Sequence, residues 1–271
     1  YHPTPLQVGF GADAYSIYEE GLYIPIMRFS NKGTINNTLI EIIKANVREP
    51  DQLIGDLFAL ASCNEIGIRR LLNMMEEFGI NNLNSISNFI LTHSFETTIK
   101  KLSQLPQKRA TGEMTIDGYH SPVKIKICLT IQEKEIICDF TGTSTVDIKG
   151  INVPLVYTKA YACYALKCAI APDIPNNAGS LAPFKVHAPV NSIVNAIHPA
   201  PVALRHIIGH FIPDTIFNAL NKIMPNTVPA EGAGTLCNFQ VSIRPNQPES
   251  DDKTNKRSEV LMFNSGEIGR A

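Results

Sequence analysis

The sequence predicts an α+β protein: a helical region followed by an antiparallel or mixed sheet that packs with further helices. Three observations support this fold class. Apolar residues recur at helical spacing between about residues 34 and 105. After Pro106 the pattern changes to strict alternation, which is typical of strands with one buried face. Beyond these strands, helical and extended segments follow one another to the end of the second half.

The first third of the chain is predicted to be an entry segment followed by three helices. Residues 1–34 are rich in Gly, Pro and aromatic residues, which favours turns and short extended pieces over helix. Thr34 is a candidate cap for the first helix, and Pro50 would stop it. Gly79 is a typical helix end. The predicted helices cover about residues 34–47, 51–78 and 85–105.

The second region is predicted to be centred on a sheet. Apolar side chains alternate with Lys124, Lys126 and Cys128, which predicts a strand with one buried face. Pro213 should kink or split the last helical segment, because proline removes a helical hydrogen bond. The expected strands are 112–116, 123–129, 135–140 and 184–187, and the expected helices are 155–169 and 203–223. Residues 244–258 are expected to form a flexible excursion. The two predicted regions are therefore 1–106 and 107–271.

Composition excludes several classes of partner. The chain has 24 Lys and Arg residues against 25 Asp and Glu residues, so it lacks the basic excess of a nucleic-acid-binding protein. No apolar run approaches the ~20 residues that cross a bilayer, so no membrane association is expected. The six cysteines form no Cys-x-x-Cys pair. They are expected to be buried thiols in a reducing compartment, which predicts a cytoplasmic protein.

Five groups of short motifs follow one another along the chain: Ile17–Pro25; Asn46–Pro50, Gly55–Leu57 and Gly67–Leu71; Asp139–Ser144 and Gly150–Pro154; Pro172–Gly179; and Pro199–Val202 with Pro229–Gly232. In this order they resemble the hydantoinase B family, whose relatives include 5-oxoprolinase and the acetone and acetophenone carboxylases. Each motif is short, but their common order along nearly the whole chain makes the resemblance specific. The family's upstream motif of the type Asn-Asp-Pro-Tyr…Gly-Thr-His…Pro-Asp is absent, so we expect one piece of a longer polypeptide.

The resemblance implies a subunit of an ATP-dependent hydrolase that opens a cyclic amide such as a hydantoin or 5-oxoproline. It also implies a hetero-oligomer in which a hydantoinase A-type subunit or domain binds ATP and Mg²⁺. In agreement, the chain has neither a Walker motif nor a Gly-x-Gly-x-x-Gly loop. Two alternatives remain open, a subunit of an ATP-dependent ketone carboxylase and a non-catalytic scaffold subunit.

Four residues are candidates for catalysis. Asp139, Thr141 and Ser144 follow a predicted strand around Gly142, where amides and hydroxyls can hold a carbonyl oxygen or a phosphate. The alternative is a turn in which these side chains satisfy only their own backbone. Glu20 lies in an aromatic-rich segment and is a candidate general base, or a residue of a subunit contact.

A second group of candidates would bind a substrate or a metal. His206, His210 and Asp214 lie four residues apart, so a continuous helix would present them on one face as possible ligands of a divalent metal. The alternative is a solvated or interdomain polar face. Arg205 can pair with a carboxylate or phosphate, or form a structural ion pair, and Asn152 is a further candidate substrate ligand. We expect the group after the strand to share one cleft with this segment.

Overall fold

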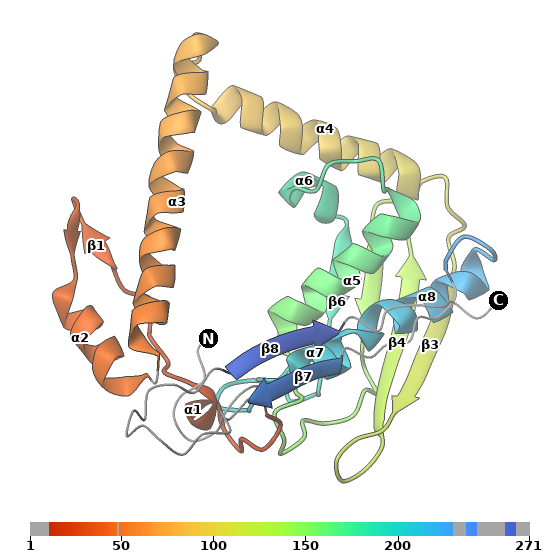
Figure 1. The fold of residues 1–271 in the computed structure, drawn as a ribbon. Coiled ribbons are helices and arrows are strands. Elements are labelled where there is room, and N and C mark those ends of the chain that lie inside the picture. Colours follow the sequence, from red (N-terminus) through yellow and green to blue (C-terminus); the bar gives the residue numbers. More distant parts are fainter. Residues whose placement is uncertain (1–10, 48, 230–236, 243–257, 264–271) are drawn as a thin grey trace.

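The computed structural model describes residues 11–47, 49–229, 237–242 and 258–263, and it confirms the α+β class (Figure 1). The helices are α1 (Ile17–Glu20), α2 (Asn37–Asn46), α3 (Pro50–Glu77), α4 (Asn84–Leu102), α5 (Leu155–Ile170), α6 (Ala178–Leu181), α7 (Arg205–Gly209) and α8 (Phe211–Ile223). The strands are β1 (Ser30–Asn31), β2 (Thr34–Ile35), β3 (Arg109–Ile116), β4 (Val123–Ile131), β5 (Ile136–Asp139), β6 (Phe184–His187), β7 (Cys237–Ser242) and β8 (Ser258–Phe263).

The central sheet is mixed, with the strand order β3-β4-β5-β6. Strands β3, β4 and β5 pair antiparallel, whereas β6 lies parallel to β5. The alternation in β4 is confirmed, because its odd-numbered residues are buried and Lys124 is exposed. Gly112 in β3 permits close packing of α8, since a Cβ at this position would collide with the carbonyl oxygen of Thr215.

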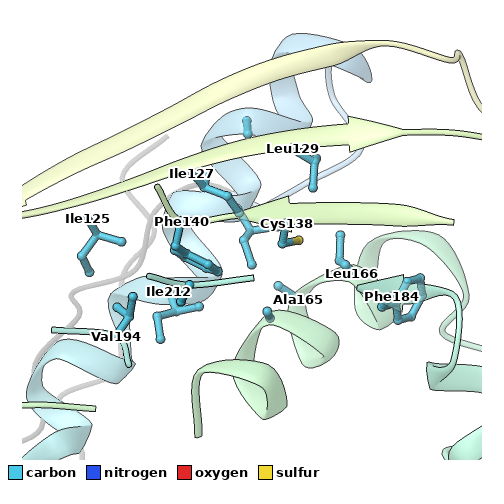
Figure 2. Packing of buried hydrophobic residues seen from close by; sticks show 14 of the residues in the cluster. Ile125, Ile127, Leu129, Cys138, Phe140, Ala165, Leu166, Phe184, Val194 and Ile212 are labelled. Atoms are coloured by element: carbon cyan, nitrogen blue, oxygen red, sulfur yellow. The ribbon is translucent and has the colours of Figure 1, made fainter. Parts of the chain in front are cut away.

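The hydrophobic core lies between one face of this sheet and helices α5 and α8. Phe140 directly follows β5 and is completely buried. Burial of such a side chain stabilises the fold by roughly 1.5–3 kcal/mol. Figure 2 shows how the core side chains of the sheet face those of the helices; it labels Ile125, Ile127, Leu129, Cys138, Phe140, Ala165, Leu166, Phe184, Val194 and Ile212.

The segment 203–223 is split into two helices, but at His210 and not at Pro213. Helix α7 ends before His210, and α8 begins directly after it. Pro213 is the third residue of α8, in the first helical turn, where backbone N–H groups have no partner inside the helix. A proline there costs no helical hydrogen bond, so it is tolerated without a kink.

Two N-terminal predictions are corrected by local turn chemistry. Thr34 does not cap a helix, because it lies in the two-stranded hairpin of β1 and β2. Lys32 and Gly33 form the hairpin turn with positive φ angles of 49° and 83°, a conformation that glycine adopts easily. Asn36 caps α2 instead, and its side chain accepts a hydrogen bond from the Leu39 amide. The entry segment also contains a single helical turn, α1, where no helix was expected.

Helices α3 and α4 form an L-shaped arm, called here the α3–α4 arm. Figure 1 shows α3 standing apart from the central sheet, while α4 returns from its far end towards α6. Helix α3 is described over its whole length, and none of its residues is buried. Helix α4 is held at α6, where the Asn177 side-chain amide donates to the Ser94 hydroxyl at 2.8 Å. Gly179 permits this contact, since a Cβ there would collide with the Leu91 carbonyl group.

Near the C-terminus, β7 and β8 pair antiparallel, which the sequence pattern did not predict. The predicted flexible excursion at 244–258 lies outside the described residues except for its last one, which begins β8. Within the described ranges, no helix combines the length and the apolar character needed to cross a membrane.

Candidate functional site

Asp139 and His187 form a polar pair at the ends of two parallel strands. They are register partners of β5 and β6, and the Asp139 carboxylate lies 3.0 Å from Nδ1 of His187. The same carboxylate oxygen accepts hydrogen bonds from the Thr141 hydroxyl at 2.6 Å and the Thr141 amide at 3.0 Å. The Thr141 hydroxyl, the largest influence, and then His187 lower the pKa of Asp139. Asp139 is therefore an ionised acceptor whose best hydrogen bonds come from its own turn.

Asp139 lies on the face of the sheet opposite to the core helices. Cys138 and Phe140 point into the core against the helices, as Figure 2 shows, so the alternation of the strand turns Asp139 to the opposite face. Helix α7 contacts α5 and α8, which cover the core face of the sheet. The sheet thus lies between the Asp139 side chain and the helices that α7 contacts, and a cleft shared by Asp139 and Arg205 stays a prediction. A strand pattern gives the face of each side chain, but it does not show on which side a distant helix packs.

Ser144 and Asn152 both hold backbone segments in place. The Ser144 hydroxyl accepts a hydrogen bond from the Lys124 amide at 2.9 Å, which extends the pairing at the start of β4. Asn152 is completely buried, and its amide group donates to the carbonyl oxygens of Asp147, Lys149 and Pro201. Asn152 therefore fixes the loop 147–152 against the segment that precedes α7.

Glu20 lies where this loop meets α1 and α7. The side chain is only 6% exposed, and its Oε1 accepts a hydrogen bond from the Ala203 amide at 2.7 Å. Its Oε2 is buried and has no hydrogen-bond partner among the residues that the structure describes. Gly150 borders the carboxylate, and a Cβ there would lie 3.1 Å from Oε1. Burial raises the pKa of Glu20, although backbone hydrogen bonds and the charge of Arg205 act in the opposite direction.

Arg205 connects Glu20 to an aromatic pair on α5. Its guanidinium carbon lies 5.9 Å from the ring centroid of Tyr157, a cation–π distance. The ring of Tyr157 is stacked on Tyr161 with centroids 4.5 Å apart. Burial, followed by a hydrogen bond to Tyr161, raises the pKa of Tyr157, so this phenol stays protonated. The Arg205 guanidinium also donates to the Val202 carbonyl oxygen at 3.3 Å, which leaves further N–H groups for a ligand.

Two half-buried histidines complete the group. The ring centroids of His206 and His210 lie 6.0 Å apart, and His210 lies 6.0 Å from Tyr161. Burial lowers the pKa of both histidines, so their imidazoles are neutral near pH 7. Gly209 permits the close approach of α7 to α5, since a Cβ at this position would collide with the ring of Tyr157. We call Glu20, Tyr157, Tyr161, Arg205, His206 and His210 the Glu20–Arg205 site.

Asp214 is not part of this site as a metal ligand. The helix breaks at His210, so the face expected from the regular four-residue spacing is not continuous. Asp214 lines a separate groove of about 620 Å³ together with Glu113 and Asn221. Among the residues described, no three His, Cys, Asp or Glu side chains are arranged to hold a metal ion. The geometry gives no support to the predicted three-ligand site.

Sequence reasoning missed several residues of both groups. Tyr157 and Tyr161 are four residues apart on a predicted helix, a spacing that could have indicated their contact. Gly150 lies in a family-like segment and His187 in a predicted strand, but neither pattern indicated a role in a site. Their positions depend on the packing of loop 147–152 against α1 and on the parallel pairing of β5 with β6.

Comparisons with known proteins identify the relatives of this chain. A family model described as hydantoinase B/oxoprolinase matches residues 7–269. A protein of Pseudomonas sp. (strain NS671), provisionally named as the B component of a D-/L-hydantoinase, is 30% identical in an alignment of 247 residues. The alignment covers 86% of this chain and 41% of that protein. The solved structure of the ATP-dependent caprolactamase of Pseudomonas jessenii is similar to this chain, with a TM-score of 0.79 at 21% sequence identity. The similar region covers 95% of this chain and 44% of the caprolactamase chain. The nucleotide-free structure of an acetone carboxylase has a TM-score of 0.68 at 13% sequence identity. The similar region covers 85% of this chain and 33% of the carboxylase chain. The chain thus spans less than half of each relative, and the two structures show a shared fold.

Proposed function

The chain belongs to the hydantoinase B/oxoprolinase family, and from this premise we propose that it forms part of an ATP-dependent hydrolase that opens cyclic amides. The Glu20–Arg205 site is its contribution to the reaction centre. The observation that carries this proposal is the buried Glu20 oxygen without a partner in the described structure, beside a guanidinium group and two neutral imidazoles. Buried polar atoms are normally hydrogen-bonded, so this exception calls for an explanation, and a group of the substrate bonded to Oε2 supplies one.

The reaction adds water across an amide bond that resonance makes unreactive. ATP, bound by a hydantoinase A-type partner with Mg²⁺, would supply a phosphoryl group to the amide oxygen and so make the carbon easier to attack. Water then adds to the ring carbon, and the C–N bond breaks as the ring nitrogen takes a proton, which leaves an acyl phosphate. A second water hydrolyses this acyl phosphate to the carboxylate and inorganic phosphate. The protein must bind the anionic oxygen, remove a proton from water and return one to nitrogen.

Arg205 is suited to the anionic oxygen. Its guanidinium group is oriented by the face of Tyr157 and by the Val202 carbonyl oxygen. A guanidinium group held in this way presents parallel N–H donors to a phosphate or carboxylate. Because one side of the group is already fixed, less conformational entropy is lost when the anion binds.

Glu20 is suited to the proton that nitrogen requires. Its Oε1 is fixed by the Ala203 amide, and its raised pKa favours the protonated acid more than in an ordinary glutamate. The proton would be carried by Oε2, which then donates to the leaving nitrogen. His206 and His210 are neutral at the same pH, so either imidazole can accept the proton of the attacking water.

The other predicted residues have a smaller place in this proposal. Asp139, Thr141, Ser144 and Asn152 are engaged with backbone or turn partners and are not assigned a step. No step is assigned to a divalent metal, because Asp214 is not grouped with the histidines among the described residues.

A cytoplasmic location remains part of the proposal. Within the described ranges, Cys63, Cys128, Cys138, Cys163 and Cys168 are free thiols, as a reducing compartment would keep them. The expectation that the cysteines are buried holds for Cys138 but is wrong for Cys63 and Cys168, which are exposed. Both lie on helices whose outward face is not covered, so an apolar sequence neighbourhood did not indicate burial.

The test combines the full chain with its A-type partner and ATP. ADP release and ring opening are measured with a hydantoin, 5-oxoproline, a larger lactam, and a ketone with bicarbonate. Glu20→Gln should lower kcat by about 10²-fold or more, whereas Glu19→Gln, a neighbour in the same helix, should change it little. Arg205→Lys should raise KM, because the parallel donors are lost. The chain without its partner should turn over neither ATP nor a hydantoin.

Other results would redirect the proposal. Full turnover by the Glu20→Gln variant would remove Glu20 from the mechanism. Activity in the presence of a ketone and bicarbonate alone would identify a carboxylase component. Binding of the partner without any stimulated ATP hydrolysis would identify a scaffold.

A further inference from the structure

The two ends of α7 meet two tyrosine rings of α5. At the beginning of α7, the guanidinium carbon of Arg205 lies 5.9 Å from the ring centroid of Tyr157. Directly after its end, the ring centroid of His210 lies 6.0 Å from that of Tyr161. Tyr157 and Tyr161 are four residues apart on α5, about one helical turn, so they point to the same side of this helix. The guanidinium group and one imidazole are therefore each placed by a different ring.

The two tyrosine rings support each other. They are stacked with an interplanar angle of 11° and centroids 4.5 Å apart, and a hydrogen bond joins their side chains. The ring of Tyr157 leaves no room for a Cβ at Gly209, so the backbone of α7 limits the movement of this ring. Aromatic rings in contact favour a small set of relative orientations. Tyr161 is therefore a fixed surface against which the ring of His210 packs.

The two imidazoles of the site differ in their surroundings. His210 packs against Tyr161 and against His206, with ring centroids 6.0 Å apart in both contacts. His206, by contrast, directly follows Arg205 in α7. Burial first, and then His210 and Arg205, lower the pKa of His206, whereas burial lowers the pKa of His210. A positive charge gained on proton transfer is thus less favourable at His206, beside the guanidinium group, than at His210.

We propose that His210 accepts the proton of the water that adds to the ring carbon, and that Tyr161 is the positioning residue that orients His210. This inference rests on the proposed function, in which either imidazole is suited to this proton. As a lone pair of the water oxygen forms the bond to the ring carbon, one O–H bond breaks and its proton goes to a ring nitrogen of His210. His210 then gives the proton to solvent and is neutral again. Tyr161 acts only through His210, because a general base must be held within hydrogen-bond reach of its proton.

The test measures kcat and KM of the full chain with its A-type partner, using the cyclic amide that the unmodified complex opens. His210→Gln should lower kcat by about 10²-fold or more, and by at least about tenfold more than His206→Gln does. Tyr161→Leu removes the ring that orients His210, so it should lower kcat by about tenfold or more with little change in KM. Tyr161→Phe keeps the ring and should retain kcat within about threefold of the unmodified chain.

Tyr119→Leu is the matched control, because Tyr119 is an exposed tyrosine outside the Glu20–Arg205 site, and its kcat and KM should be unchanged. Circular dichroism shows whether each variant is folded, and the two histidine variants decide the proposal even where Tyr161→Leu is unfolded. A loss for His206→Gln as large as that for His210→Gln overturns it, as does a Tyr161→Leu effect confined to KM or one equally present in Tyr161→Phe. In these outcomes Glu20→Gln is still impaired. A fully active Glu20→Gln variant instead overturns the proposed function, and this inference with it.

Discussion

The sheet and the α3–α4 arm use the same kind of apolar pattern with opposite results. In β4 the apolar side chains are buried against α5 and α8, and Ile127 has no exposed surface. In α3 the pattern is as regular, yet Ile68 is 60% exposed. Hydrophobic periodicity therefore predicts the type of an element, but not whether its apolar face is covered within the same chain. The arm has an apolar composition like that of an interior, although no residue of α3 is buried within the described part of the chain.

The largest expected contrast comes from removing one large side chain in each region. Phe140→Ala should lower the free energy of unfolding by about 3–5 kcal/mol, because it leaves a cavity in the core. Ile68→Ala should change it by less than about 1 kcal/mol, because the side chain is already largely in water. Urea denaturation of both variants at low protein concentration measures the difference. Equal losses would contradict the view that the arm is uncovered.

Glycine replacements sharpen the comparison at the backbone. Gly112→Ala should destabilise by about 1–3 kcal/mol or more, since the new methyl group would collide with α8 at Thr215 and Ala219. Gly67→Ala in α3 meets no atom within 4 Å and should stabilise by about 0.5–1 kcal/mol through helix propensity. Thermal unfolding of the two variants should shift in opposite directions. A loss of stability for Gly67→Ala would show that α3 is covered.

The junction between the two regions can be weakened selectively. The Asn177 side chain caps α6 by accepting from the Ser180 amide, and it also donates to Ser94 of α4. Asn177→Ala should cost about 0.5–2 kcal/mol and increase hydrogen exchange in α4 more than in β4. Asn73→Ala on α3 is the control, with an expected change within about 0.5 kcal/mol. Unchanged exchange in α4 would mean that other contacts hold the arm.

The smallest expected effect is the loss of the stabilisation by Asp139, on the face of the sheet away from the core, as the pH is lowered. The folded-state pKa of Asp139 is lowered, so its stabilisation is present above the ordinary aspartate pKa of about 3.9 and is lost as pH falls through the lower folded value. Asp139→Asn should therefore destabilise at neutral pH and converge with the unmodified chain below about pH 4. The effect should stay below about 1 kcal/mol because the site is exposed. Asp117→Asn is the control, and a constant difference at all pH values would contradict the assignment.

Much of the fold could be predicted because its signals are local. Strand β4 follows from alternation, and helix α3 follows from spacing with Gly79 at its end. The errors also have local causes. The Lys32-Gly33 turn competes with helix at Thr34, and a proline in the first turn of α8 does not act as a breaker. These errors come from turn and cap geometry, which depends on individual φ angles more than on composition.

The site was less predictable because its contacts are distant in sequence. Glu20 accepts its hydrogen bond from a residue 183 positions away. The turn after β5 was predicted from the sequence. The alternation of the strand does not show on which side of the sheet α7 packs, so it could not place Asp139 relative to Arg205. Arg205 and the two histidines became candidates because their residue types cluster in the sequence, whereas Gly150 and Tyr157 become part of the proposed site only through packing.

The parallel pairing of β5 with β6 also determines the order in which the sheet can assemble. Strands β3, β4 and β5 are joined by short turns, whereas Asp139 and His187 are 48 residues apart. Closing that longer loop costs more conformational entropy, so β6 is expected to join after the hairpins have formed and α5 has packed on them. Until then β5 is an open edge with unpaired backbone groups. During folding, this edge is the place where two chains can associate incorrectly.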